Sequence, residues 1–373
     1  MALAAGRTRS GPAGALRRPV IPMSTPARAL TPVVILFGRV GDMIMLTAAL
    51  SLLRRRYGGP CHVVAAGPWN RDIYRGHPDV ARCWTLPRHL PFAVTGEWLG
   101  AVRALRRSAP APIYIAEAMP RQLLRIRRLL SLSAIEAGRC VFLEGAPNLQ
   151  EHYLESLVRL AERTPPVLAS ADYPLPGGPS APRLVTLEAE RSQCQALLQQ
   201  RGWSGRPIVL IQPGTARTLS VRSRKRWQRD NDRSWPVERW RVLLHALRER
   251  HPQAALVLRG AASELPFLEA LREAIGLEGL EVAGLGLRAS FALMEAAESM
   301  ISMDTGMAHA AAALGLPVVV IMGANPQSRV LPRAASGSAV VGVGGPPVSR
   351  RADQIPVEAV LQAWCSLPVC PRV

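Results

Sequence analysis

The sequence predicts two α/β domains, each a mostly parallel sheet with helices on both faces, as in doubly wound, Rossmann-like folds. The 373 residues suffice for two domains of ordinary size. Short apolar runs alternate with helical stretches along the chain, which is the order that a parallel sheet requires. A stretch rich in proline and glycine at 164–182 separates two sets of such elements and is typical of a linker.

The expected domain limits follow from this division. We expect a disordered basic tail at 1–30, a first domain at 31–163, the linker at 164–182, a second domain at 183–350, and a C-terminal helix and tail at 351–373. Pro356 suits the first position of that last helix. We expect this helix to pack back across the two domains.

The composition narrows the kinds of partner. A net charge of +19 and a pI near 11.2 indicate an anionic partner, which leaves nucleic acid, an anionic lipid surface or a phosphorylated substrate. An arginine-rich genome is an alternative source of the charge. The six cysteines show no zinc-binding spacing, so we expect free thiols in a reducing cytoplasm. No apolar run reaches the ~18 residues of a transmembrane helix, and the tail has no apolar core of a signal peptide.

The first domain opens with a strand at 33–37, a turn at 38–42 and a helix from Met43. Asp42, beside Gly41, therefore stands at the carboxyl end of the first parallel strand, where ligands bind in such sheets. Alternatively, Asp42 only caps the helix. The remaining elements expected here are strands at 61–65, 83–86 and 111–116 and helices at 97–107 and 120–132.

Arg121 and Arg125 lie one turn apart on the last of these helices. Guanidinium groups match phosphates and carboxylates, so the pair is a candidate acceptor-binding site. A solvated helix face is the alternative.

The second domain is expected to follow the same alternation. Helices are expected at 188–201, 237–250, 264–274 and 287–297, and strands at 208–211, 255–258 and 280–283. Gln212, Gly214 and Thr215 follow the first of these strands in a Pro-Gly turn that offers backbone N–H groups and a hydroxyl to a ligand. An ordinary turn is the alternative.

The most informative stretch runs from Met300 to Gly323 and is typical of a strand, a turn, a helix and a second strand. Asp304 and Thr305 are good N-cap residues, and Gly306 permits a close backbone approach. The start of such a helix is an anion site, and His309 lies on its first turn. A capped helix with a surface histidine is the alternative.

Several of these motifs together resemble glycosyltransferase family 9, the ADP-heptose:lipopolysaccharide heptosyltransferases. The family carries Asp-Thr-Gly-x-x-His, as at 304–309 here, followed by Ala-Leu-Gly-x-Pro. It also carries Gly-Asp after the first strand, as at 41–42 here. Its His-Pro-Gly-[Ser/Thr] motif matches 212–215, with Gln212 in place of the histidine. The family has a phosphate-binding lysine before Trp-Pro. Arg233 takes that place before Trp235-Pro236, with Lys225 in a rival register.

The resemblance implies a GT-B fold, in which two Rossmann-like domains face each other across a cleft. It implies an inverting, metal-independent transfer of a sugar, heptose from ADP-heptose, to a lipopolysaccharide-type or related glycan acceptor. Asp42 would be the general base, with Glu117 or His152 as substitutes. The donor would be bound by the following residues: Gln212, Gly214, Thr215, Arg233, Asp304, Thr305, Gly306 and His309. Gly41, Arg121 and Arg125 would bind the acceptor.

The remaining expectations concern partners and alternatives. We expect no metal, no cofactor and no nucleic acid, and a monomer. We expect a nucleotide-sugar donor and an anionic glycolipid or glycan acceptor, and a cytoplasmic enzyme that associates peripherally with the inner face of the inner membrane. Asp230 and Asp232 form an Asp-x-Asp that would bind a metal in other glycosyltransferases. Arg288 stands where some heptosyltransferases have an acid that engages the nucleoside. A GT-B sugar-nucleotide epimerase and a basic nucleic-acid-binding protein are the rival functions.

Overall fold

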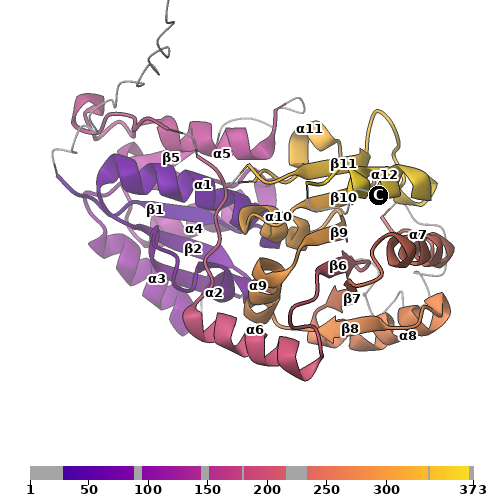
Figure 1. Cartoon of the computed structure of the whole chain (residues 1–373). Coiled ribbons are helices and arrows are strands. Elements are labelled where there is room, and N and C mark those ends of the chain that lie inside the picture. Colours follow the sequence, from indigo (N-terminus) through magenta and orange to yellow (C-terminus); the bar gives the residue numbers. More distant parts are fainter. Residues whose placement is uncertain are drawn as a thin grey trace, which may run out of the picture.

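The computed structural model describes residues 28–87, 95–143, 151–178, 180–215, 233–334 and 337–368. Two parallel sheets lie side by side, each enclosed by helices, with the first half of the chain forming one domain and the second half the other (Figure 1). Lys225, Asp230, Asp232 and most of the expected N-terminal tail fall outside the described residues.

The first sheet has five strands in the order β3-β2-β1-β4-β5. Its strands are β1 (Val33–Leu36), β2 (Cys61–Ala66), β3 (Val80–Leu86), β4 (Ile113–Ile115) and β5 (Cys140–Phe142). Its helices are α1 (Val40–Tyr57), α2 (Trp69–Tyr74), α3 (Gly96–Arg107), α4 (Pro120–Leu132) and α5 (Tyr153–Glu162).

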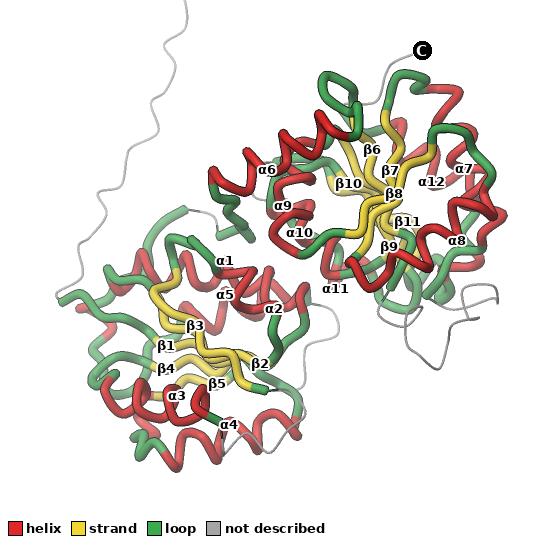
Figure 2. The backbone as a smooth tube through the Cα atoms, turned by 90° about the horizontal axis from the view of Figure 1, so that it is seen from below, coloured by secondary structure: helices red, strands yellow, loops and turns green. Residues whose placement is uncertain are grey.

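Both faces of this sheet are covered, which explains why its central strand is apolar throughout. On β1, Val34 and Leu36 pack with α1, α2 and α5. Val33 and Ile35 point to the opposite face and pack with α3 and α4. Figure 2 shows the sheet between these helices.

The second sheet has six strands in the order β11-β10-β9-β6-β7-β8. Its strands are β6 (Ile208–Gln212), β7 (Ala255–Gly260), β8 (Leu280–Gly284), β9 (Ser299–Met303), β10 (Val318–Met322) and β11 (Val340–Gly344). The helices of this half are α6 (Glu188–Gln200), α7 (Val237–Arg250), α8 (Leu265–Ile275), α9 (Leu287–Ala296), α10 (Gly306–Ala313), α11 (Gln327–Val330) and α12 (Val357–Cys365).

The helix α12 lies on the second domain, so the expected packing back across both domains is wrong for this helix. It contacts α7, β10 and β11. Val360 and Trp364 are buried in the same apolar cluster as α7 and α8. The indole of Trp364 donates a hydrogen bond to Ser299 Oγ at 3.0 Å, which fixes the helix against β9.

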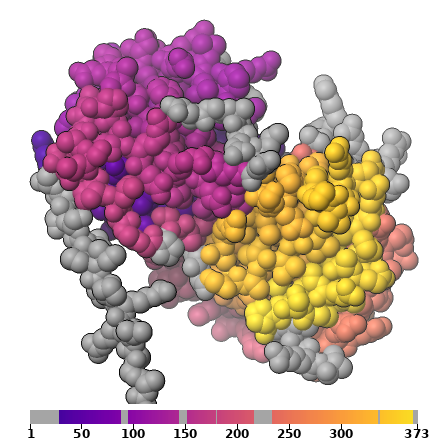
Figure 3. All heavy atoms as spheres, turned by 90° about the horizontal axis from the view of Figure 1, so that it is seen from above, coloured from indigo at the N-terminus to yellow at the C-terminus, as the bar shows by residue number. Residues whose placement is uncertain are grey.

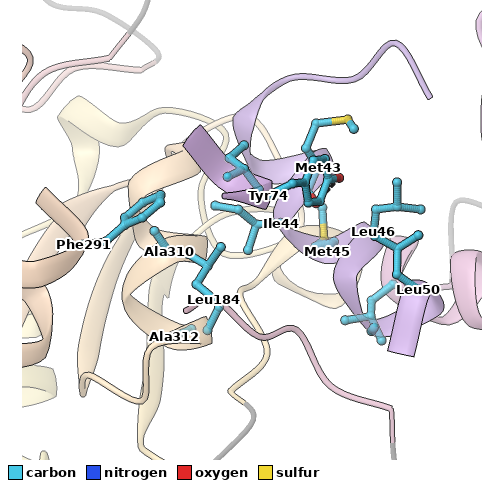
Figure 4. Packing of buried hydrophobic residues seen from close by; sticks show 14 of the residues in the cluster. Met43, Ile44, Met45, Leu46, Leu50, Tyr74, Leu184, Phe291, Ala310 and Ala312 are labelled. Atoms are coloured by element: carbon cyan, nitrogen blue, oxygen red, sulfur yellow. Dashed lines mark hydrogen bonds between the residues drawn. The ribbon is translucent and has the colours of Figure 1, made fainter. Parts of the chain in front are cut away.

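The two domains meet through a continuous apolar core between α1 and α10. Met43 and Ile44 of α1 belong to one buried cluster with Ala310, Ala312 and Phe291 of the second domain (Figure 4). The alanines of α10 allow the two helices to approach closely. In the space-filling view the two domains press directly against each other (Figure 3). The starts of these two helices are thereby held together.

Two buried polar contacts add to this interface. The guanidinium of Arg288 on α9 forms an ion pair with Glu190 of α6 and donates to the carbonyl oxygen of Asp72 in the first domain at 3.0 Å. His152, the N-cap of α5, contacts the carbonyl oxygen of Leu331 in the second domain at 2.8 Å. Arg288 therefore joins the domains, and it is not among the residues that line the cavity between them.

Candidate active site

A cavity of about 780 Å³ lies between the domains, where the start of α1 faces the carboxyl ends of β6, β7, β8 and β9. This volume is in the range of small-molecule sites. Ten of the twelve predicted site residues line it: Gly41, Asp42, Gln212, Gly214, Thr215, Arg233, Asp304, Thr305, Gly306 and His309. Arg121 and Arg125 do not.

Asp42 is held by the first turn of α1. It is the third residue of the helix, and its Oδ2 accepts the backbone N–H of Arg39, the N-cap residue, at 2.7 Å. The capping role therefore exists, and it coexists with a place in the cavity wall. Gly38 makes this possible, because a Cβ at that position would lie 2.7 Å from the Cβ of Asp42.

Glu117 and His152 are poor substitutes for Asp42 as a base, because Asp42 lines the cavity and they do not. One oxygen of Glu117, just beyond β4, accepts the N–H groups of Ala118 and Met119 at 3.0 and 2.9 Å. On His152, Nδ1 accepts the N–H of Leu154, so Nε2 carries the proton that it donates to Leu331. Neither side chain lines the cavity.

Burial shifts the pKa values of Glu117 and His152. It raises the pKa of Glu117, and the neighbouring charge of Asp42 adds to that shift. It lowers the pKa of His152. The carboxylates of Asp42 and Glu117 therefore lie close enough for their charges to interact.

The start of α10 also borders the cavity, next to the first turn of α1. β9 ends at Met303, and Thr305 caps the helix by accepting the N–H of Met307 at 3.3 Å. Thr305, Gly306 and Met307 all line the cavity. The positive end of the helix dipole and its first N–H groups therefore border the space beside Asp42.

Asp304 is fixed by its neighbours at this end of the sheet. Its Oδ2 accepts a hydrogen bond from the Asn325 side chain at 2.7 Å, which ties the loop after β10 to the cavity. Burial raises the pKa of Asp304, while Asn325 and the charge of Arg233 oppose that shift. Arg233 thus lies close enough to act electrostatically on the same wall.

His309 lies at the domain contact. It is buried, and a Cβ at Gly41 would come within 2.9 Å of its Cδ2. Burial, with a smaller contribution from His152, lowers the pKa of His309 to about 4. The ring is therefore neutral at pH 7, so it offers a phosphate an N–H group and no charge.

Gln212 lines the cavity and also has two hydrogen-bond partners within its wall. Its amide donates to the carbonyl oxygen of Gly214 at 3.1 Å and so shapes the turn after β6. Its oxygen accepts from the guanidinium of Arg259, which lies at the end of β7 and lines the cavity. Arg259 was not among the predicted site residues, although a charged residue at the end of an apolar parallel strand is a signal for one.

The two predicted acceptor arginines lie outside the cavity on α4. Arg125 donates to Gln122 at 2.9 Å and lies over the ring of Phe37 at 5.7 Å from its centre. Arg121 is exposed. Within the described ranges, no group of three or more His, Cys, Asp or Glu side chains is arranged to hold a metal ion.

Comparisons with known proteins agree with this geometry. Residues 145–345 match the model of glycosyltransferase family 9 (heptosyltransferase). A comparison with curated protein sequences finds no match.

Three solved structures are similar over most of the chain. ADP-heptose lps heptosyltransferase II of E. coli is 19% identical, with a TM-score of 0.66 over 90% of this chain and 97% of that one. E. coli heptosyltransferase WaaC with ADP is 17% identical, with a TM-score of 0.62 over 89% and 98%. A family 9 glycosyl transferase from Veillonella parvula DSM 2008 is 14% identical, with a TM-score of 0.62 over 80% and 82%. The predicted fold of two Rossmann-like domains is confirmed.

Proposed function

The chain belongs to glycosyltransferase family 9, and we propose that it transfers heptose from ADP-heptose to a lipopolysaccharide-type or related glycan acceptor. One observation carries this proposal. The carboxylate of Asp42, on the first domain, and the start of α10, on the second, border the same cavity. A proton acceptor and the N-terminus of a helix thus adjoin one space of nucleotide-sugar size.

The reaction is a single displacement at the anomeric carbon. Asp42 takes the proton of the acceptor hydroxyl as its oxygen attacks, while the bond from the anomeric carbon to the diphosphate breaks on the opposite face. The configuration inverts. The leaving diphosphate gains negative charge. The α10 N-terminus, Thr215 and Arg233 stabilise this charge, and His309 donates an N–H to the diphosphate.

Product analysis tests the proposal. Incubation with ADP-heptose and a lipopolysaccharide-type acceptor should give a glycosylated acceptor of inverted anomeric configuration together with ADP. Conversion of the nucleotide sugar without any acceptor would instead identify an epimerase. If another nucleotide sugar is turned over and ADP-heptose is not, the protein is still a glycosyltransferase, but its donor is different from the one proposed.

Metal independence gives a second expected result. Activity should survive an excess of EDTA, because fixed N–H donors and Arg233 offset the charge of the leaving diphosphate. Initial rates with and without EDTA measure this. Complete loss that magnesium or manganese restores would make Asp230 and Asp232 the candidates for a metal site.

We also propose that the enzyme docks on an anionic membrane through one face of the first domain. Among the described residues, no helix is both long and apolar enough to cross a bilayer. The exposed face of α3 and α4, here called the α3–α4 face, instead combines large apolar side chains with arginines. Its exposed residues are Leu99, Arg103, Arg106 and Arg107 of α3, Met119 just before α4, and Arg121, Leu124, Arg127, Arg128 and Leu132 of α4.

A vesicle experiment tests this face. Arg121, Leu124, Arg128 and Leu132 recur at helical spacing on α4, so they form one stripe. The double variant Leu124→Ser, Arg128→Gln should bind phosphatidylglycerol vesicles at least about tenfold more weakly, since it removes one apolar side chain and one cation from the surface.

Arg241→Gln with Val242→Ser on α7 is the matched control, because Val242 is 55% exposed on the second domain. It should bind as the wild type does. Equal binding by wild type and the α4 variant would rule out this face.

A further inference from the structure

Arg259 is a buried cation in the wall of the cavity. Only 3% of it is exposed, although it lies among the residues that line the space. Its Nη1 donates to Gln212 Oε1 and its Nη2 to Ser290 Oγ at 3.0 Å, and both acceptors are neutral. Its Nε is buried with no hydrogen-bond partner in the described part of the chain.

A guanidinium in this setting lacks its usual counterion. Buried charges in proteins are normally paired, because an uncompensated one is costly. No carboxylate of the described residues forms a salt bridge with Arg259 within 4.0 Å. The nearest charge that acts on it is that of Glu264, whose carboxylate lines the same cavity and accepts the N–H of Ala261. Burial lowers the pKa of Arg259 to about 10, so the group still carries its charge at pH 7.

The sheet order places this charge near the anion site of α10. The strands run β9-β6-β7, so Arg259 at the end of β7 is two strands from the turn that precedes α10. Its side chain reaches back to Gln212 at the end of β6. The side chain of Arg259 thus extends from β7 toward β6, the strand that lies between β7 and β9. An anion with two charged groups can contact both.

We propose that Arg259 is a second cationic subsite for the donor's diphosphate, which it clamps from the β7 side opposite the start of α10. Gln212 and Ser290 are positioning residues that hold the planar fork. Arginine suits this role because its donors match phosphate oxygens in pairs. The inference rests on the proposed function and adds a residue that the family motifs do not contain.

Binding calorimetry with inorganic pyrophosphate, ADP and adenosine tests the subsite. Arg259→Met should lower the affinities for pyrophosphate and ADP about 10–100-fold, because a charged hydrogen-bonding group is lost. The affinity for adenosine should stay within about threefold. A purely structural role would weaken all three ligands together.

Arg139→Met is the matched control. Arg139 is a buried arginine of the first domain whose guanidinium donates to Ala111 O, and it does not line the cavity. Its variant should keep the ADP-to-adenosine preference of the wild type. If Arg259→Met does not fold, Arg259→Lys decides the question. Lysine keeps the charge without the fork, so ADP affinity should fall at least about threefold with adenosine unchanged.

The outcomes separate this inference from the proposed function. An unchanged ADP-to-adenosine preference in a folded Arg259 variant would overturn the subsite and leave the glycosyltransferase proposal standing. If pyrophosphate binding depends on Arg259 but the wild type does not bind ADP, the subsite is supported and the proposal that the donor is an ADP-linked sugar is overturned. A wild-type protein that binds neither would overturn both.

Discussion

Replacing Asp42 by asparagine should lower kcat by about 10²–10⁴-fold, the usual contribution of a positioned general base. A sugar hydroxyl is a poor nucleophile at neutral pH, and asparagine cannot take its proton. The fold should persist, because the asparagine side-chain oxygen can accept the Arg39 N–H that Asp42 accepts now. Donor affinity should change little, since the expected donor contacts come from the second domain. Steady-state rates at saturating donor, with calorimetry for donor binding, measure both effects.

Asp72→Asn provides the comparison for this variant. Asp72 is also an aspartate near the start of a first-domain helix, but it pairs with Arg75 on the surface and does not line the cavity. Its substitution should leave kcat unchanged. An Asp42→Asn enzyme that binds donor and turns over near the wild-type rate would show that Asp42 serves only as a cap. Glu117 and His152 do not line the cavity, which argues against either as its replacement.

The central strands could be predicted because they are buried on both faces. β1, β6 and β10 are continuous apolar runs, and each is followed by a turn with glycine or polar residues. Of the four edge strands, β3 and β8 were predicted, whereas β5 and β11 were not. β5 has only three residues, and β11 is interrupted by glycines and is half-buried throughout. Short, partly covered strands leave too weak a pattern to separate them from loops.

The position of α12 shows a second limit. An amphipathic pattern indicates that a helix buries one face, but it does not say against which domain. That choice depends on contacts such as the one between Trp364 and Ser299, residues 65 positions apart in the chain.

Site residues could be predicted where the course of the backbone alone brings them to the cavity. They were missed where their role depends on the direction of the side chain and on its neighbours. Asp42 and Gly306 reach the cavity because the ends of parallel strands meet at one edge of the sheet. Arg259 also ends a strand, but its part depends on the neighbours Gln212 and Ser290. Arg288 stands where some heptosyltransferases have an acid, and the sequence could not show that it bridges the domains, because its partners Glu190 and Asp72 come from distant segments.

Replacing Gly306 by valine should raise the dissociation constant for ADP at least about tenfold. A side chain here collides with the first domain, because an added Cβ would lie 2.7 Å from the Val40 Cβ and 3.0 Å from the Gly41 nitrogen. Overpacking of this kind typically costs ~1–3 kcal/mol of folding stability, which favours a separation of α1 from α10. A tenfold loss of affinity for ADP corresponds to ~1.4 kcal/mol of binding free energy. The sequence alone indicated only that the glycine lets a ligand approach. The structure adds that it lets the starts of α1 and α10 touch.

Calorimetric titration of ADP into both proteins measures the effect, and Gly96→Val is the matched substitution. Gly96 opens α3 on the far face of the first domain, and no atom lies within 4 Å of a Cβ added there. That variant should bind ADP as the wild type does. Because valine at 306 pushes α1 away from α10, the two cavity walls separate, and the anion site loses its position beside Asp42. A folded Gly306→Val protein with wild-type ADP affinity would therefore contradict both the anion site at α10 and the need for this close contact.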